Sequence, residues 1–232
     1  MSETLFDLSQ VESERIKLPD DVNLAWGRIT VTFAAATQTE HDSGMNWYFG
    51  AHNLCQEWSQ EFGHPVDVIA GIVASLSPLE TWNGNVKNAL TLLRTGDVRT
   101  MGRSKEDALA ILHSQDPEGV LYAETKNNPK VRAFFENIRD PEGSSAVTID
   151  RHMISMLAGV KLPAKEQWIP PKENERAAVW FRGVAQMLGI KPHQVQAVTW
   201  NVWRRMHGFS SLGTVKGAGA SENVQITLGL DD

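Results

Sequence analysis

The chain has a single cysteine, Cys55, among its 232 residues. One cysteine excludes an intrachain disulfide, a four-cysteine zinc site and an iron–sulfur cluster, and it favours a reducing, cytoplasmic location. No run of 18 apolar residues occurs, and the first residues, MSETLFDLSQVESERIK, are acidic rather than basic and then apolar. The sequence therefore predicts neither a membrane-spanning segment nor a secretory signal.

Signatures of metal-dependent and cofactor-dependent enzymes are also missing. The seven histidines occur without HxxxH or HExxH spacing, and no GxxxxGK, GxGxxG or GxSxG motif is present. These motifs supply zinc ligands, phosphate-binding glycine loops and the exposed serine nucleophile of hydrolases. We therefore expect no metal and no cofactor.

The composition is that of a folded chain, with 41% hydrophobic and 22% charged residues, but its charge is unevenly distributed. Residues 151–220 carry a net charge of +7, whereas residues 1–22 carry −4 and residues 221–232 carry −3. This asymmetry indicates either a phosphate-facing surface with acidic arms, or charges that folding mixes again in space.

Helical periodicity dominates from residue 45 onward. Tyr48, Ala51, Cys55, Trp58 and Phe62 recur at intervals of three and four, which predicts one amphipathic helix that ends at Gly63. The same pattern and its proline and glycine boundaries predict further helices over residues 65–77, 82–93, 104–112, 131–138, 151–158, 173–188 and 193–206. Residues 24–35 fit a helix or a strand, and residues 224–228 fit a strand.

The expected class is all-α, or nearly so. We predict one helical domain over residues 23–208, preceded by an acidic arm over residues 1–22 and followed by a glycine-rich, loosely ordered tail over residues 209–232.

Two segments resemble a known family. Residues 70–89, AGIVASLSPLETWNGNVKNA, are similar to the LLSxQTxxxxVxxA element of the helix-hairpin-helix DNA glycosylase superfamily. Residues 146–159, AVTIDRHMISMLAG, are similar to that family's VDTHVxRV segment, whose aspartate heads a helix and points into the base pocket. The resemblance implies a two-lobed helical fold, DNA as the partner and Asp150 as the catalytic residue.

The chain also departs from the family pattern. Residues 126–133, KNNPKVRA, stand where the family has a hairpin close to LPGVGxKTA. The lysine of strand-cutting members falls on Arg132, while Lys130 is two residues too early. Because arginine stays protonated, it cannot act as an amine nucleophile, so the resemblance implies a monofunctional enzyme. These departures resemble a divergent, phage-associated branch that modifies thymine-derived bases.

Elementary chemistry gives Asp150 the same role. Breaking an N-glycosidic bond passes through an oxocarbenium-like sugar, which a fixed and ionised carboxylate near C1′ stabilises while it aligns a water molecule. A helix start orients such a carboxylate through backbone N–H groups. The alternative is that Asp150 is only a helix cap.

The resemblance and the residue types suggest the remainder of the site. An extruded base needs aromatic and polar walls, and the candidates are Tyr48, His52, Ser77, Trp82, Asn85 and His152. Phosphate contacts need cations, and the candidates are Lys126, Lys130, Arg132, Arg151, Arg204 and Arg205. Core packing is the alternative for the aromatic residues, and complementing the helix dipole is the alternative for Arg204 and Arg205.

The first hypothesis is a monomeric, monofunctional DNA glycosylase-like hydrolase that releases a base, which we expect to be modified, through Asp150 and water. The second keeps the fold but makes the protein a transferase of DNA base hypermodification. The third is a DNA-binding or inhibitor protein without catalysis.

Overall fold

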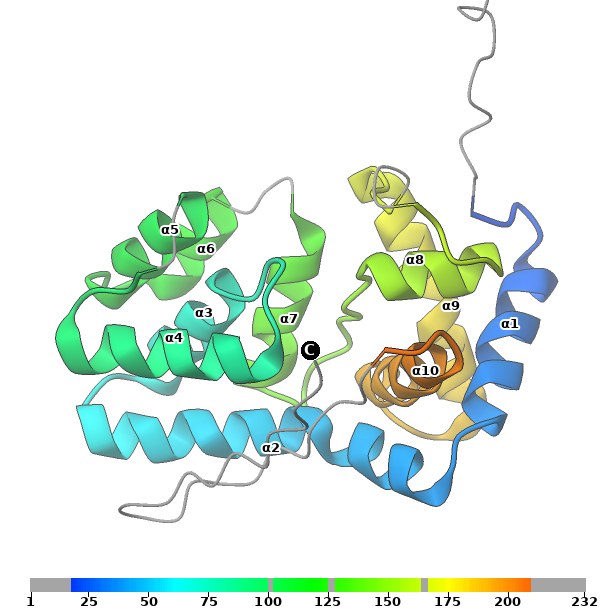
Figure 1. Ribbon diagram of the computed structural model, residues 1–232, viewed down its shortest axis with the longest axis horizontal. Helices are drawn as coiled ribbons and strands as arrows, with labels where there is room; N and C mark the ends of the chain where they lie inside the picture. Colours follow the sequence, from blue (N-terminus) through cyan, green and yellow to red (C-terminus); the bar gives the residue numbers. More distant parts are fainter. Residues whose placement is uncertain (1–17, 100–101, 125–127, 164–166, 210–232) are drawn as a thin grey trace, which may run out of the picture.

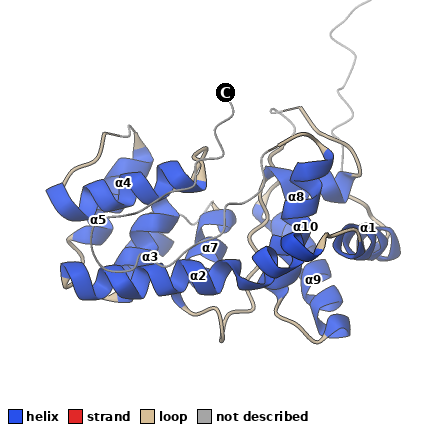
Figure 2. Cartoon of the chain, turned by 60° about the horizontal axis from the view of Figure 1, so that its bottom comes forward, coloured by secondary structure: helices blue, strands red, loops and turns tan. Residues whose placement is uncertain are grey.

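The structure is a computed structural model that describes residues 18–99, 102–124, 128–163 and 167–209 (Figure 1). Within those ranges all regular secondary structure is helical, as the sequence predicts (Figure 2). The helices are α1 (Val22–Ala34), α2 (Gln38–Phe62), α3 (Val66–Ser75), α4 (Trp82–Thr95), α5 (Arg103–Leu112), α6 (Pro117–Glu124), α7 (Pro129–Arg139), α8 (Arg151–Ala158), α9 (Pro171–Leu188) and α10 (Pro192–Met206).

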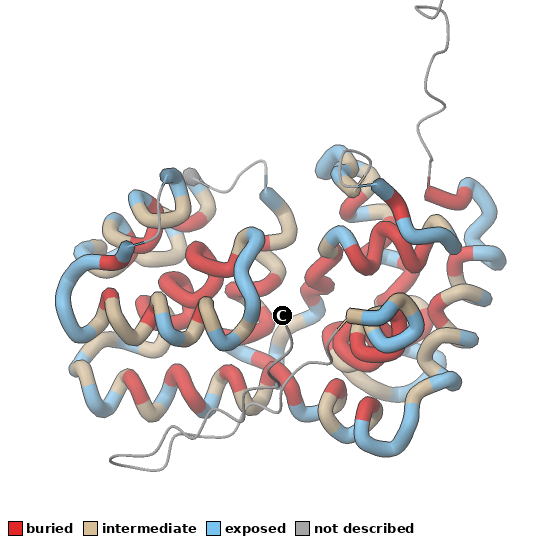
Figure 3. The backbone as a smooth tube through the Cα atoms, in the orientation of Figure 1, coloured by how far each residue is buried: buried red, intermediate tan, exposed pale blue. Residues whose placement is uncertain are grey.

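The described residues bury two hydrophobic cores, one on each side of Figure 3. The first core is built by α2 from Trp47 onward with α3 to α7, around Ile72 and Phe135. The second is built by α1, α8, α9 and α10, around Met153 and Phe181. Helix α10 contributes to both cores, with Ala197 in the first and Val195 and Trp203 in the second, and it packs against α2.

Several helix boundaries follow the sequence signals. The predicted glycine ends of α2, α4, α8 and α9 are confirmed, and each glycine adopts a left-handed conformation. Helix α2 begins earlier than its apolar stripe predicts. Thr37 and Glu40 form a capping box that starts the helix at Gln38, ahead of the first apolar repeat.

Two segments are helical where the sequence left the structure open or predicted no helix. Residues 24–35, which fit a helix or a strand, lie mostly in α1, where Ala25 and Ile29 are one turn apart and face the second core. Helix α6 lies in a stretch where the sequence predicts no helix. Its eight residues are too few to show a clear helical period. Residues 1–17 of the acidic arm and residues 210–232 of the tail, with the strand expected over 224–228, are outside the described ranges.

In the part of the chain that the structure describes, no helix combines the length and apolar character needed to cross a membrane.

Helices α2 and α10 approach most closely at Gly44. A Cβ atom placed there would lie 2.6 Å from the backbone nitrogen of Val198 and 2.7 Å from its Cα. We therefore expect Gly44→Ala to lower the free energy of unfolding by about 1–3 kcal/mol, because backbone atoms cannot yield as a side chain does. Urea denaturation followed by circular dichroism measures this.

Gly27→Ala in α1 is the matched control. A Cβ atom there meets nothing within 4 Å, so the helix should gain roughly 0.5–1 kcal/mol from alanine. Equal effects of the two substitutions would contradict the close packing of α2 on α10.

Candidate functional site

Asp150 lies at the junction between the two cores and caps the start of α8. Its Oδ1 accepts hydrogen bonds from the backbone nitrogens of His152 at 2.9 Å and Met153 at 3.0 Å. Its Oδ2 accepts a hydrogen bond from Nε1 of Trp200 at 2.7 Å. The predicted position at a helix start is confirmed, and the indole bond is an interaction that capping does not require.

Cations from both halves of the molecule surround this carboxylate. Burial lowers the pKa of Lys130, in the first turn of α7, and the nearby Asp150 carboxylate opposes that shift. Burial also lowers the pKa of Arg204, again against the effect of Asp150, and its guanidinium lies 4.3 Å from the Trp200 ring centre. Lys130 of α7 and Arg204 of α10 therefore interact electrostatically with the carboxylate that caps α8.

His152, two residues after Asp150 in α8, is buried. Burial lowers its pKa from the ordinary value of 6.5, and Arg204, Arg151 and Lys130 lower it further while Asp150 opposes them. The imidazole is therefore neutral at pH 7. Its Nε2 lies 3.4 Å from Nε of Arg151 and 3.4 Å from Nη1 of Arg204. Because guanidinium groups only donate, this nitrogen is the acceptor for both.

The structure brings Lys130, and not Arg132, to Asp150. The Arg132 guanidinium lies 4.2 Å from the ring centre of Tyr122, on another side of α7. Residues two positions apart on a helix point about 200° apart, so only one of the two can face the junction. Spacing along the sequence therefore misplaced the cation that accompanies the carboxylate.

A buried polar network ties the segment before Asp150 to three helices. The Tyr48 hydroxyl lies 2.9 Å from Oγ1 of Thr148 and 3.0 Å from Oε1 of Gln196. Nδ2 of Asn137 donates to Thr148 Oγ1 at 3.3 Å. Burial strongly raises the pKa of Tyr48, so its hydroxyl stays protonated and donates. Tyr48 is thus a buried support of the Asp150 segment.

Ser77, Trp82 and Asn85 come together where α3 ends and α4 begins, next to Trp47. The rings of Trp47 and Trp82 meet at 4.9 Å, and Asn85 donates to the Val73 carbonyl at 3.0 Å. Among the described residues, no hydrogen-bond partner is found for the buried Trp47 Nε1, Ser77 Oγ and Asn85 Oδ1. Trp47, which was not among the candidate residues, also contributes to this aromatic and polar wall.

The loop between α3 and α4 presents an apolar side chain outward. Leu79 is 94% exposed and adopts a positive φ of 62°, which a side chain with a Cβ seldom does. The Glu80 N–H donates to the Ser77 carbonyl at 3.4 Å, which places Leu79 at the third position of a turn, where a type II turn has a positive φ.

His52 and Arg205 have structural partners away from Asp150. Nδ1 of His52 donates to the Ile138 carbonyl at 2.8 Å, and its Nε2 accepts from Gln56 at 2.9 Å, so both ring nitrogens have structural partners. Nε of Arg205 donates to Glu40 at 2.6 Å and thereby joins the end of α10 to the start of α2. Lys126 is outside the described residues.

The role of Trp200 was missed in the sequence. Trp203 stacks on His207 with ring centres 3.8 Å apart, while Trp200 reaches Asp150. The signal available was the spacing of Trp200 and Arg204, since residues four apart on a helix are neighbours.

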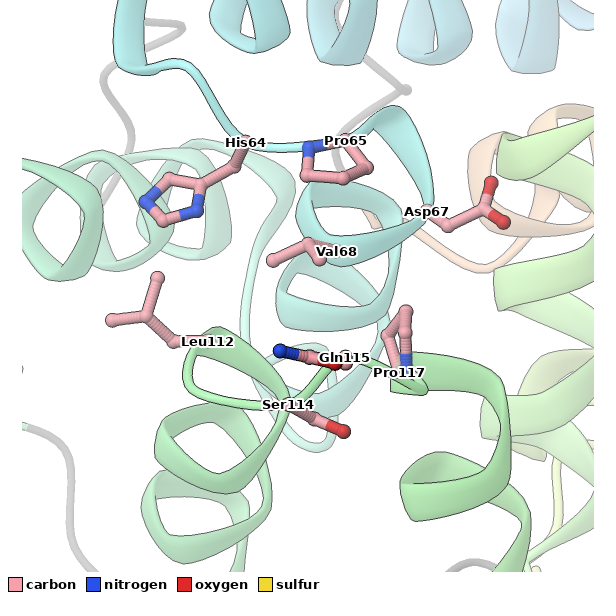
Figure 4. A pocket seen from close by; sticks show the side chains of 8 residues that line it. All are labelled: His64, Pro65, Asp67, Val68, Leu112, Ser114, Gln115 and Pro117. Atoms are coloured by element: carbon pink, nitrogen blue, oxygen red, sulfur yellow. The ribbon is translucent and has the colours of Figure 1, made fainter.

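A surface hollow lies away from this group. It holds about 420 Å³ between the start of α3, the end of α5 and the start of α6, and its walls include His64, Asp67 and Gln115 (Figure 4). None of its residues contributes to the group around Asp150. In the ranges described, no cluster of three or more histidine, cysteine or acidic side chains is placed to hold a metal ion.

Comparison with known proteins assigns the chain to a family without assigning it an activity. Residues 16–207 match the model of a family of unknown function, DUF7178, and the chain belongs to this family. No curated protein and no solved structure matches. The function therefore has to be argued from the site.

The Tyr48 network generates a stability prediction. Tyr48→Phe should lower the free energy of unfolding by about 1–3 kcal/mol, because the buried Gln196 Oε1 loses its donor and the Thr148 hydroxyl loses a partner. Adding Thr148→Val should cost less than the sum of the two single changes, since it removes one of the two groups left without a partner. Urea denaturation of the four proteins measures the coupling, and strictly additive costs would contradict the network.

Proposed function

We propose that the chain is a DNA glycosylase-like enzyme of the helix-hairpin-helix type, which cleaves the N-glycosidic bond of a modified base. The observation that carries the proposal is the Asp150 carboxylate, held by three N–H donors at the junction of two helical cores and surrounded by cations. The two cores and the helix that they share are compatible with a two-lobed glycosylase-like fold.

The chemistry assigned to Asp150 is electrostatic. As the bond between C1′ and the base nitrogen breaks, its electron pair leaves with the base and positive charge develops on the sugar. A carboxylate that is already oriented stabilises this charge without reorganising. In this proposal Asp150 also aligns the water that attacks C1′, and the departing base takes up a proton.

The base would occupy the wall formed by Trp47, Trp82, Ser77 and Asn85. An enzyme that acts on a base in duplex DNA extrudes it and holds it by stacking and hydrogen bonding. The exposed Leu79 supports a DNA-facing role for the adjoining loop, because apolar side chains commonly fill or wedge open a base step. The buried polar atoms without partners would then meet the edge of the base.

The position of Lys130 favours a second candidate reaction. Burial lowers the pKa of this amine, and a lysine with a lowered pKa is a better nucleophile. In that reaction the Lys130 amine attacks C1′ in place of water, and loss of the base leaves a Schiff base on the opened sugar. The hypermodification transferase and the catalytically inactive DNA-binding or inhibitor protein are the remaining alternatives. Mass spectrometry of unmodified and hypermodified phage DNA separates these alternatives by released bases, bases of altered mass, or no change.

The first functional prediction concerns Asp150→Asn. Asparagine caps a helix about as well as aspartate, so the fold should persist, while base release should fall by about 10²–10³-fold. Released base is measured by mass spectrometry, and DNA binding by fluorescence anisotropy.

Trp200→Phe is the matched control. An asparagine has one acceptor oxygen, so Asp150→Asn also loses the hydrogen bond from Trp200. Trp200→Phe loses the same bond but keeps the carboxylate, and it should retain more activity than Asp150→Asn. Normal base release by Asp150→Asn would leave Asp150 as a helix cap alone.

The second functional prediction concerns the nucleophile. With water as the nucleophile, borohydride should trap no covalent protein–DNA adduct, and strand breaks should appear only after alkali or heat. An adduct formed by the wild type and lost in Lys130→Arg would show that Lys130, and not water, is the nucleophile. The arginine variant keeps the positive charge at the site while removing the nucleophilic amine.

A further inference from the structure

Two guanidinium groups converge on one uncharged atom beside Asp150. Nε of Arg151 and Nη1 of Arg204 both lie 3.4 Å from Nε2 of His152, although they come from different helices, α8 and α10. This distance is at the long end for a hydrogen bond, so the contact of each guanidinium with Nε2 is weak. Two like charges at one neutral nitrogen repel each other.

The charges that act on His152 are mainly positive. Lys130 also acts on His152, so three cations and one carboxylate determine the field at the imidazole. That carboxylate, Asp150, already accepts hydrogen bonds from two backbone N–H groups and one indole. Burial also lowers the pKa of Lys130 and of Arg204, which shows that bringing these cations together out of water is costly.

The two arginines are also oriented. The guanidinium plane of Arg204 is held near the Trp200 ring at 4.3 Å and the Phe209 ring at 5.5 Å. Arg151 is the first residue of α8, where the backbone dipole adds positive potential. A planar guanidinium held in place forms paired hydrogen bonds to phosphate oxygens with little further loss of side-chain freedom.

We propose that Arg151 and Arg204 form a phosphate-binding site at the Nε2 side of His152, with Lys130 adding to its positive field. A phosphate group placed there accepts hydrogen bonds from both guanidiniums and relieves their mutual repulsion. The shared chemistry is that of phosphate oxygens, whose source is either a phosphodiester of nucleic acid or a free phosphate. The phosphodiester source rests on the proposed function, and it places the backbone of a bound nucleotide next to Asp150.

Titration with inorganic phosphate tests the site itself. In a phosphate-free buffer at constant ionic strength, the ¹⁵N resonance of His152 Nε2 should shift saturably as the guanidiniums turn to phosphate. Arg151→Gln with Arg204→Gln should weaken phosphate binding by about tenfold or more for each guanidinium removed. Lys172→Gln, which removes one exposed cation from the start of α9, is the matched control and should bind as the wild type does.

A dinucleotide series identifies the source of the phosphate. If the source is nucleic acid, TpT should shift the same resonance, while its uncharged methylphosphonate analogue and thymidine should not. If TpT leaves the resonance unchanged and inorganic phosphate shifts it, the site takes free phosphate. Thermal melts of every variant confirm that each one is folded.

The outcomes separate this site from the proposed reaction. Asp150→Asn should keep phosphate binding even where base release is lost, because the guanidiniums remain. Saturable phosphate binding by a wild type that releases no base would support the site and overturn the glycosylase proposal. An unshifted His152 resonance, or a double variant that binds phosphate as the wild type does, would overturn the phosphate site.

Discussion

The close approach of α2 and α10 at Gly44 is the constraint on which the arrangement of the molecule depends. No side chain separates the two helices there, so the backbone of Val198 lies against Gly44. This contact fixes the first half of α2 on α10, which contributes to both cores, while α2 from Trp47 onward belongs to the first core. Two residues beyond Val198, α10 carries Trp200, which reaches Asp150. The position of the carboxylate relative to both cores therefore follows from the packing of one helix pair.

Most of the fold could be predicted from local signals. Apolar periodicity and left-handed glycines mark helix ends without reference to distant parts of the chain, as at Gly63 and Gly159. The early start of α2 also had a local signal, the threonine and glutamate three residues apart at Thr37 and Glu40. Helix α6 had none, because among its described side chains Leu121 alone is fully buried, and one buried position shows no periodicity.

The site was less predictable because its contacts join residues far apart in the sequence. The position of Asp150 before a helix is a local property, and the sequence predicted it. The bond from Trp200 spans fifty residues, and the meeting of Lys130 with Asp150 depends on how α7 faces α8. Arg205 resembled a surface cation next to Arg204, yet its partner is Glu40 on α2. Tertiary packing decides such pairings, and residue type and spacing do not encode it.

The membership of the two cores has a consequence for how the chain folds during synthesis. The first core uses helices from the middle of the chain, from α2 to α7, with Ala197 of α10 at its edge. The second core draws on α1 and then on α8, α9 and α10, so its parts leave the ribosome at well-separated times. Because domains form as soon as their contacts are available, the first core can collapse once α7 has emerged. Helix α1 must wait with its apolar face uncovered until α8 and α9, and then α10, have emerged.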